Sequence, residues 1–237
     1  GARLVPELVN KGYNVKACGR SIEKLRKRPW CDDPKVELIE FDVFNTESLT
    51  NACQGSQAAY YLIHSMNPDG KEFERADREA AQNMVLAAED AGLSRIVYLG
   101  GLGEKDETLS KHLLSRIEVG EILLSGKVPT TVLRAAMIIG AGSASFEILR
   151  YLVERLHFMI TPKWVRILSQ PIAIRDVLNY LVGCLESQET ENATFDIGGP
   201  EVLSYNRLME LYAEEACLNK RIIIPVPVLT PKLSSYW

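Results

Sequence analysis

Short apolar runs alternate with segments of helical period along the first 135 residues, and this alternation constrains the fold more than any other feature. Each run has the length and the β-branched and aromatic content of a buried strand. The predicted strands are 14–19, 36–41, 58–63, 95–99 and 130–134. Because parallel neighbours cannot be joined by tight turns, strands separated by helices predict a parallel sheet covered on both faces. The predicted fold class is therefore α/β, with a doubly wound parallel sheet.

Two helices are predicted most clearly. Between residues 63 and 95 the apolar positions fall on one stripe, and Gly92 supplies a C-terminal cap. A second helix is predicted over 109–125, followed by Gly126. Both lie between predicted strands, as crossover helices do.

After Gly142 the pattern becomes helix-rich. Helices are predicted near 145–158, 175–187 and 204–218, with short strands near Arg166, Phe195 and Ile222. The chain is therefore expected to divide into a sheet domain, residues 1–142, and a smaller helix-rich C-terminal lobe, residues 143–237, of the same fold.

Composition excludes several classes of protein. The formal net charge is −4, whereas binding to nucleic acid needs clustered cations. The five cysteines form no C-x-x-C pair, so neither a disulfide framework nor a metal site is expected. No stretch approaches 18 uninterrupted apolar residues and no charged-then-apolar segment opens the sequence, so we expect neither a membrane span nor a secretory signal. We expect a cytoplasmic protein with no membrane or nucleic-acid partner.

The chain opens on a predicted helix, 1–9, with no strand before it. A sheet that lacks its first strand exposes a pairing edge, so we expect the natural gene product to extend upstream and to supply that strand. The C-terminal end also stops without a turn signal, which leaves the possibility that the natural chain continues there.

Gly1, the helix after it and the following strand look like the tail of a G-x-x-G-x-x-G dinucleotide fingerprint, with Gly1 as the third glycine. In that motif the diphosphate rests on backbone N–H groups at the start of the helix. Gly1 is therefore a candidate cofactor-binding residue.

Several further motifs occur in the order found in one superfamily. They are Cys18-Gly19-Arg20-Ser21, Phe41-Asp42-Val43, Leu62-Ile63-His64-Ser65, Leu133-Arg134-Ala135-Ala136, Gly140-Ala141-Gly142 and Ile197-Gly198-Gly199-Pro200. With them the chain resembles the atypical short-chain dehydrogenases/reductases, especially the NmrA-like and nucleoside-diphosphate-sugar-epimerase-like branches. The resemblance implies a Rossmann sheet that binds NAD(P).

The end of the second strand of such a sheet selects the cofactor. A free ribose 2′-hydroxyl is usually bound by Asp or Glu there, whereas a 2′-phosphate needs a cation. Here the strand is followed by Arg20 and Ser21, and Lys24 lies one helical turn further on. NADP(H) is therefore favoured over NAD(H). The alternative is that Arg20 and Lys24 only solvate the start of a helix.

The resemblance places other cofactor contacts after the next two strands. Asp42 and Val43 are expected around the adenine, although Asp42 also suits a helix N-cap. Leu62, Ile63 and His64 are expected beneath the cofactor's sugar and diphosphate, although a histidine at a strand end is as often packed or capping.

The usual catalytic pattern of the superfamily, a serine near the fifth strand followed by Y-x-x-x-K, is absent. Gly100 and Gly101 stand where the serine is expected, and the helix offers His112 and Arg116 at the same four-residue spacing. His112 is therefore the candidate catalytic acid/base, and Arg116 a candidate contact to ribose or phosphate. The alternative is that both are only exposed helix residues. Tyr98 is expected in the core.

A substrate pocket is expected between residues 100–102, residues 135–142 and the smaller lobe, and Gly100 and Ala135 are also candidate cofactor contacts. Met137, Phe146 and Trp164 are candidate apolar walls and equally explicable as core.

Three functions stay open at this point. The first is an NADP(H)-dependent oxidoreductase acting on a small carbonyl or hydroxyl substrate. The second is a non-catalytic NADP(H)-sensing regulator or assembly protein, which the missing serine and tyrosine favour. The third is a relative of the nucleotide-sugar epimerases and dehydratases, suggested by the Gly198-Gly199-Pro200 motif.

Overall fold

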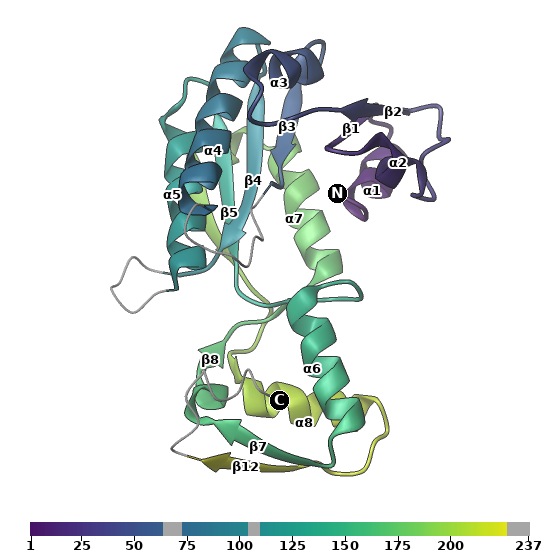
Figure 1. The fold of residues 1–237 in the computed structure, drawn as a ribbon, viewed down its shortest axis with the longest axis vertical. Coiled ribbons are helices and arrows are strands. Elements are labelled where there is room, and N and C mark those ends of the chain that lie inside the picture. Colours follow the sequence, from purple (N-terminus) through teal and green to yellow (C-terminus); the bar gives the residue numbers. More distant parts are fainter. Residues whose placement is uncertain (64–72, 104–109, 227–237) are drawn as a thin grey trace. The chain divides into compact units, whose positions relative to one another are not determined.

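The computed structural model describes residues 1–63, 73–103 and 110–226 (Figure 1). They form two compact units that interleave along the chain. The first contains Gly1–Arg134 and Leu178–Asp196, and the second contains Ala135–Val177 and the residues from Ile197 onward. The single domain boundary at residue 142 stays a prediction.

Parallel strands form the centre of the first unit. Strands β3 (Ala58–Tyr61), β4 (Arg95–Gly101), β5 (Thr130–Ala135) and β10 (Ala193–Ile197) make a sheet of order β10-β5-β4-β3. Strands β3 and β4 are parallel, in a register that pairs Ala58 with Arg95. The predicted α/β class with a parallel sheet is confirmed.

A second parallel pair belongs to the same unit. Strand β1 (Val15–Gly19) pairs with β2 (Val36–Glu40) in a register that joins Gly19 to Glu40. Both strands begin and end within one residue of the predicted ranges. Because the register aligns their carboxyl ends, the residues after β1 and after β2 lie at the same edge.

The strand near Phe195 differs from the prediction. We expected it in the smaller lobe, whereas the structure pairs it, as β10, with β5 in the main sheet. The local pattern correctly indicates a strand, but the pairing partner is set by contacts between residues far apart in the sequence. This pairing brings the segment from Leu178 to Asp196 back into the first unit.

Helices cover both sides of the sheet, with α4 and α5 on one side and α7 on the other (Figure 1). The helices of the first unit are α1 (Leu4–Asn10), α2 (Ile22–Arg26), α3 (Thr46–Cys53), α4 (Phe73–Asp90), α5 (Lys111–Ser125) and the larger part of α7 (Ile174–Glu186). On the α7 side, the Tyr60 hydroxyl donates to the Leu181 carbonyl at 3.1 Å.

Helices α4 and α5 are joined by polar as well as apolar contacts. The Ser115 hydroxyl donates to the buried carboxylate of Asp77 at 2.9 Å. Arg78 forms a two-bond ion pair with Glu118, at 2.8 and 3.1 Å. These pairs join α4 and α5 to each other.

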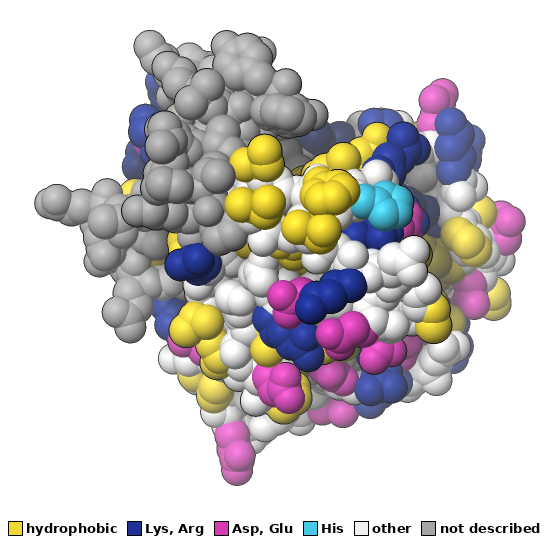
Figure 2. All heavy atoms as spheres, turned by 90° about the horizontal axis from the view of Figure 1, so that it is seen from below, with side chains coloured by type: hydrophobic (Ala, Val, Ile, Leu, Met, Phe, Trp, Pro, Cys, Tyr) yellow, Lys and Arg dark blue, Asp and Glu magenta, His cyan; other side chains and the backbone are white. Residues whose placement is uncertain are grey.

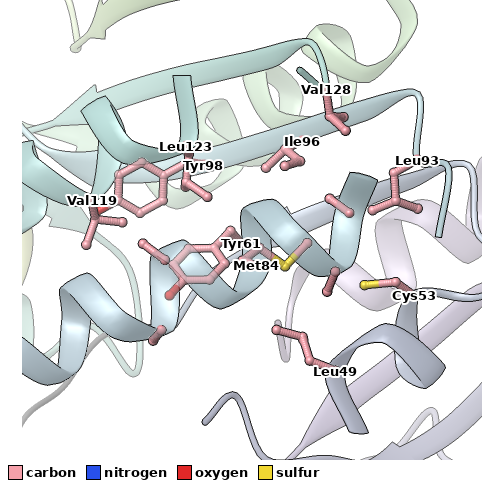
Figure 3. Close-up of a cluster of buried hydrophobic side chains, with 14 of the residues drawn as sticks. Leu49, Cys53, Tyr61, Met84, Leu93, Ile96, Tyr98, Val119, Leu123 and Val128 are labelled. Carbon is pink, nitrogen blue, oxygen red and sulfur yellow. The ribbon is translucent and has the colours of Figure 1, made fainter. Parts of the chain in front are cut away.

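The core of the first unit lies between α3, α4, α5 and the strands (Figure 3). Its labelled members are Leu49, Cys53, Tyr61, Met84, Leu93, Ile96, Tyr98, Val119, Leu123 and Val128. Their burial supplies the main apolar stabilisation of this unit.

The second unit combines short strands with two long helices. Its elements are β6 (Ile138–Ile139), α6 (Ala144–Arg155), β7 (Phe158–Pro162), the 3₁₀ helix η1 (Lys163–Arg166), β8 (Leu168–Ser169), β9 (Ile172–Ala173), β11 (Leu203–Ser204), α8 (Tyr205–Glu215) and β12 (Ile222–Val226). Its core includes Leu149 and Val153 of α6 and Leu208 and Met209 of α8. The predicted helices near residues 145 and 204 are therefore present. Ser204 is the N-cap of α8, and its hydroxyl accepts a hydrogen bond from the Arg207 amide.

The parallel pair β7–β12 has two apolar faces. Met159, on the inner face, is 4% exposed and packs in the core of its unit. On the outer face Phe158 and Ile160 are 69% and 61% exposed, opposite Ile222 and Ile224. Figure 2 shows the molecule from below, the side on which Figure 1 draws β7 and β12. Apolar side chains gather near the middle of that view.

No helix in the part of the chain that the structure describes is long and apolar enough to cross a membrane. The same residues contain no group of three or more His, Cys, Asp or Glu side chains placed to hold a metal ion.

Candidate functional site

The cations expected at the cofactor lie directly beyond β1. Strand β1 ends at Gly19, and Leu25 of α2 packs where a Gly19 side chain would stand, with Leu25 Cδ2 3.5 Å from an ideal Cβ position. Arg20 and Lys24 are exposed, and within the described residues neither side chain forms a hydrogen bond or an ion pair. Ser21 occupies the N-cap position of α2 without a side-chain capping bond. These three side chains are free to bind a ligand.

At Gly1, before α1, no atom lies within 4 Å of an ideal Cβ position. The Gly1 carbonyl accepts a bond from the Val5 amide at 3.1 Å. Trp30, which the sequence analysis did not single out, donates its indole Nε1–H to the Ala2 carbonyl at 2.9 Å.

Asp42 has a local structural role. Its carboxylate accepts from the Phe44 amide at 3.0 Å, and its own amide donates to the Ser48 hydroxyl at 3.4 Å. The alternative that Asp42 caps a helix is wrong. Helix α3 begins at Thr46, and Asn45 is its N-cap, accepting a bond from the Ser48 amide at 2.9 Å.

Three apolar candidates follow two of the strands. Val43 comes after β2, and Leu62 and Ile63 come directly after β3. Val43 is buried in the core, and its carbonyl accepts from Asn83 Nδ2 at 2.9 Å. Leu62 and Ile63 are half-buried after β3, and Ile63 packs against the same core. His64 lies outside the described residues.

A polar groove of about 570 Å³ runs beside β2 and α3. Its lining includes the carboxylates of Glu37, Glu40 and Glu47. Carboxylates repel phosphate, so this groove does not suit the charged part of a dinucleotide.

Gly100 and Gly101 explain the missing serine in steric terms. A Cβ at Gly101 would lie 2.6 Å from Leu113 Cδ1, and one at Gly100 would lie 2.9 Å from the Tyr98 ring. The Leu113 side chain of α5 therefore occupies the space that a side chain at Gly101 would fill. A serine there would require Leu113 to move.

Tyr98 is a core residue, as expected. It is 3% exposed, its ring lies edge-on to Tyr61, and its hydroxyl donates to the Arg116 carbonyl at 3.1 Å (Figure 3). Burial raises the pKa of its phenol far above the usual value.

His112 and Arg116 lie in different surroundings despite their four-residue spacing. Arg116 is half-buried, and its Cδ and Nη1 lie 3.4 and 3.9 Å from an ideal Cβ position on Gly101. His112 is exposed and stacks on Phe73 of α4, with ring centroids 4.3 Å apart. Arg116 is thus at the carboxyl end of β4, and His112 is on the side of α5 that meets α4.

Another arginine at the strand ends already has a partner. Arg134 of β5 pairs with Asp196 of β10 through two bonds of 2.6 and 2.9 Å, and also donates to the Gly103 carbonyl. It serves to join two strands. Ala135, the last residue of β5, is buried.

The candidate pocket walls belong to the core of the second unit. Met137 is buried there and Phe146 packs against that core, while the side chain of Trp164 is outside the described part. The substrate pocket itself stays a prediction.

The family model for NAD(P)H-binding proteins matches residues 1–136, more than half of the chain. The chain therefore belongs to this NAD(P)H-binding family, and its resemblance to the atypical short-chain dehydrogenases/reductases is confirmed.

Individual relatives are more distant. The chain is 22% identical over 234 residues to the mitochondrial NADH-ubiquinone oxidoreductase 40 kDa subunit of Neurospora crassa, covering 98% of this chain but only 61% of the relative. It is 21% identical over 235 residues to the photosystem II assembly factor Ycf39 of Trieres chinensis, covering 99% of this chain and 71% of the relative.

Among solved structures, a nucleoside-diphosphate-sugar epimerase from Staphylococcus aureus superposes with a TM-score of 0.79 at 18% identity. The match covers 100% of this chain and 79% of the epimerase. At this identity the likeness concerns the fold, and it agrees with a Rossmann sheet.

Proposed function

We propose that this chain binds NADP(H) in preference to NAD(H) at the carboxyl ends of its parallel strands. The observation that carries the proposal is the pair of exposed cations, Arg20 and Lys24, which have no ion partner within the described residues. A guanidinium offers phosphate a planar pair of donors, and an ammonium adds a point charge. The residues after β1, Arg20-Ser21-Ile22, include no carboxylate that would repel a 2′-phosphate.

Calorimetric titration of the protein with NADPH and with NADH tests this proposal. One charge-assisted contact contributes about 1.5–3 kcal/mol, so we expect NADPH to bind at least about tenfold more tightly. Equal affinities would reject the preference, and no binding of either dinucleotide would reject the site.

We further propose that this chain is a regulator or an assembly protein that binds the dinucleotide without catalysing a reaction with it. The packing of the Leu113 side chain on Gly101 supports this, because a serine at that position, where the active superfamily members place their hydroxyl, would require Leu113 to move. The likeness to an assembly factor and to a respiratory-complex subunit supports it as well. A cytoplasmic location is part of the proposal and rests on composition alone.

The second candidate is an NADP(H)-dependent oxidoreductase on a small carbonyl or hydroxyl compound. The exposure of His112 favours it, since an accessible imidazole can act as a general acid or base. NADPH oxidation across a panel of aldehydes and ketones separates the two candidates. Saturable turnover selects the oxidoreductase, and tight NADPH binding without turnover selects the binding protein.

A further inference from the structure

Phe44 is an exposed aromatic residue that follows the carboxyl end of β2. Two apolar residues close to it belong to the core of the first unit, because Val43 is 5% exposed and Phe41 packs against that core. Phe44, in contrast, is 46% exposed. A single exposed phenylalanine is common on protein surfaces, so the position of this one decides whether it indicates a ligand.

A tight turn holds the backbone of Phe44. The Asn45 amide donates to the Asp42 carbonyl at 3.1 Å, and the Asp42 carboxylate accepts from the Phe44 amide at 3.0 Å. Asn83 Nδ2 of α4 donates to the carbonyl of Val43, in the middle of the same turn, at 2.9 Å. The phenyl ring is therefore carried by a preorganised turn, so a ligand that covers the ring does not have to order the backbone beneath it.

This turn lies beside the end of β1. The Phe41 amide donates to the Gly19 carbonyl at 3.1 Å, which continues the parallel register that pairs Gly19 with Glu40. Arg20 directly follows Gly19, and the turn that carries Phe44 begins directly after Phe41. A backbone hydrogen bond thus joins the strand end that precedes the cation to the strand end that precedes the aromatic ring. Both are at carboxyl ends of parallel strands, where such sheets bind their ligands.

The two side chains suit two different parts of an adenosine 2′-phosphate. A guanidinium binds the phosphate, whereas a flat aromatic ring offers a purine a surface on which to stack. Stacking on an aromatic side chain strengthens the binding of a base by about tenfold or more. This contribution does not depend on whether the ribose carries a 2′-phosphate.

We propose that Phe44 is a binding residue for the adenine of the dinucleotide, which stacks on the phenyl ring. The proposal rests on the dinucleotide binding proposed above and adds the group that recognises the base. In this arrangement Arg20 distinguishes NADPH from NADH, and Phe44 contributes equally to the binding of both.

Titration of Phe44→Ala with NADPH, NADH and adenosine 2′,5′-bisphosphate tests the assignment. All three contain adenine, so the variant should bind each about tenfold more weakly and leave the NADPH/NADH affinity ratio unchanged. Phe195→Ala is the matched control, because it removes another exposed phenylalanine, from β10 of the same unit. It should leave all three affinities unchanged. Wild-type affinities in Phe44→Ala, or a loss confined to NADPH, overturn the inference.

A spectroscopic variant separates stacking from a general loosening of the fold. Phe44→Trp retains a flat aromatic face, so it should bind NADPH as tightly as the wild type. The fluorescence of the introduced indole should be quenched when adenosine 2′,5′-bisphosphate is added, and the wild-type protein titrated in parallel corrects for the other tryptophans. An introduced indole that binding does not quench overturns the inference.

Failure of this inference is distinguishable from failure of the proposed function. A wild-type protein that binds neither dinucleotide contradicts the proposed function, and the role of Phe44 with it. A wild-type protein that binds both equally contradicts only the preference for NADPH. A wild-type protein that prefers NADPH, with affinities that survive Phe44→Ala, contradicts only the role of Phe44.

Discussion

The imidazole of His112 lies parallel to the ring of Phe73, with the centroids 4.3 Å apart and the planes inclined by 16°. The stack joins the first turn of α5 to the first residue of α4. Together with Ser115–Asp77 and Arg78–Glu118 it forms a ladder of contacts between the two helices. His112 therefore has a packing role that the four-residue spacing to Arg116 did not indicate.

We predict that His112→Ala leaves NADPH affinity within about threefold of wild type and removes any reductase turnover, since an imidazole supplies proton transfer that alanine cannot. Titration and NADPH oxidation measure the two effects separately. His112→Phe is the matched variant, because it keeps a ring able to stack on Phe73 and cannot transfer a proton. Turnover that survives in both variants would make His112 a packing residue alone.

Arg20→Glu should abolish the preference for NADPH over NADH. The substitution replaces a cation by a carboxylate at the point where a 2′-phosphate is expected and a free ribose hydroxyl is otherwise bound. The ratio of the two dissociation constants measures the effect. Lys27→Glu makes the same charge change at the C-terminal end of α2, further from the end of β1, and should lower the ratio much less. An unchanged ratio in Arg20→Glu would refute the phosphate site.

Gly101→Ala should lower the free energy of unfolding by about 1–2 kcal/mol, because the new methyl group meets Leu113 Cδ1 at 2.6 Å. Combined with Leu113→Ala, which removes the colliding atoms, the glycine substitution should cost much less. Chemical denaturation of the two single variants and the double variant gives the coupling. Additive losses would show that α5 and β4 do not limit each other at this point.

The fold class was predictable because strand and helix periods are local properties. Strands β1 to β5 and helices α4 and α5 lie close to the predicted ranges. The pairing of β10 with β5 was not predictable, since a five-residue strand pattern contains no information about its partner.

The candidate site likewise has features that the sequence predicts and features that it does not. The exposed cations beyond β1 followed from the position of the strand end, which the local pattern gives. The role of Asn45 in place of Asp42 depended on where α3 begins, and helix ends are set by a few residues of variable register. The bond from Trp30 to Ala2 spans 28 residues and had no signal in the sequence beyond an isolated tryptophan.

Arg95 illustrates a buried structural charge. At the start of β4 it donates to the Cys184 and Ser187 carbonyls at 3.0 and 3.3 Å and pairs with Glu191 at 2.6 Å. We predict that Arg95→Met lowers the free energy of unfolding by about 3 kcal/mol, because the carbonyls at the C-terminal end of α7 lose their donor in a buried site. Arg78→Met, which removes an exposed pair with Glu118, is the control and should cost far less. Equal losses in urea denaturation would contradict the structural role of Arg95.

The two faces of β7 provide the last prediction. Met159 and Ile160 are adjacent, and they are 4% and 61% exposed. Met159→Ala should lower the free energy of unfolding by about 2–4 kcal/mol, because truncating a buried side chain loses transfer energy and leaves a cavity. Ile160→Ala removes side-chain atoms that already contact water, so its cost should stay below about 1 kcal/mol. Denaturation monitored by circular dichroism on both variants measures the difference. A larger loss for Ile160→Ala would mean that the outer face of β7 is covered when the protein is in solution.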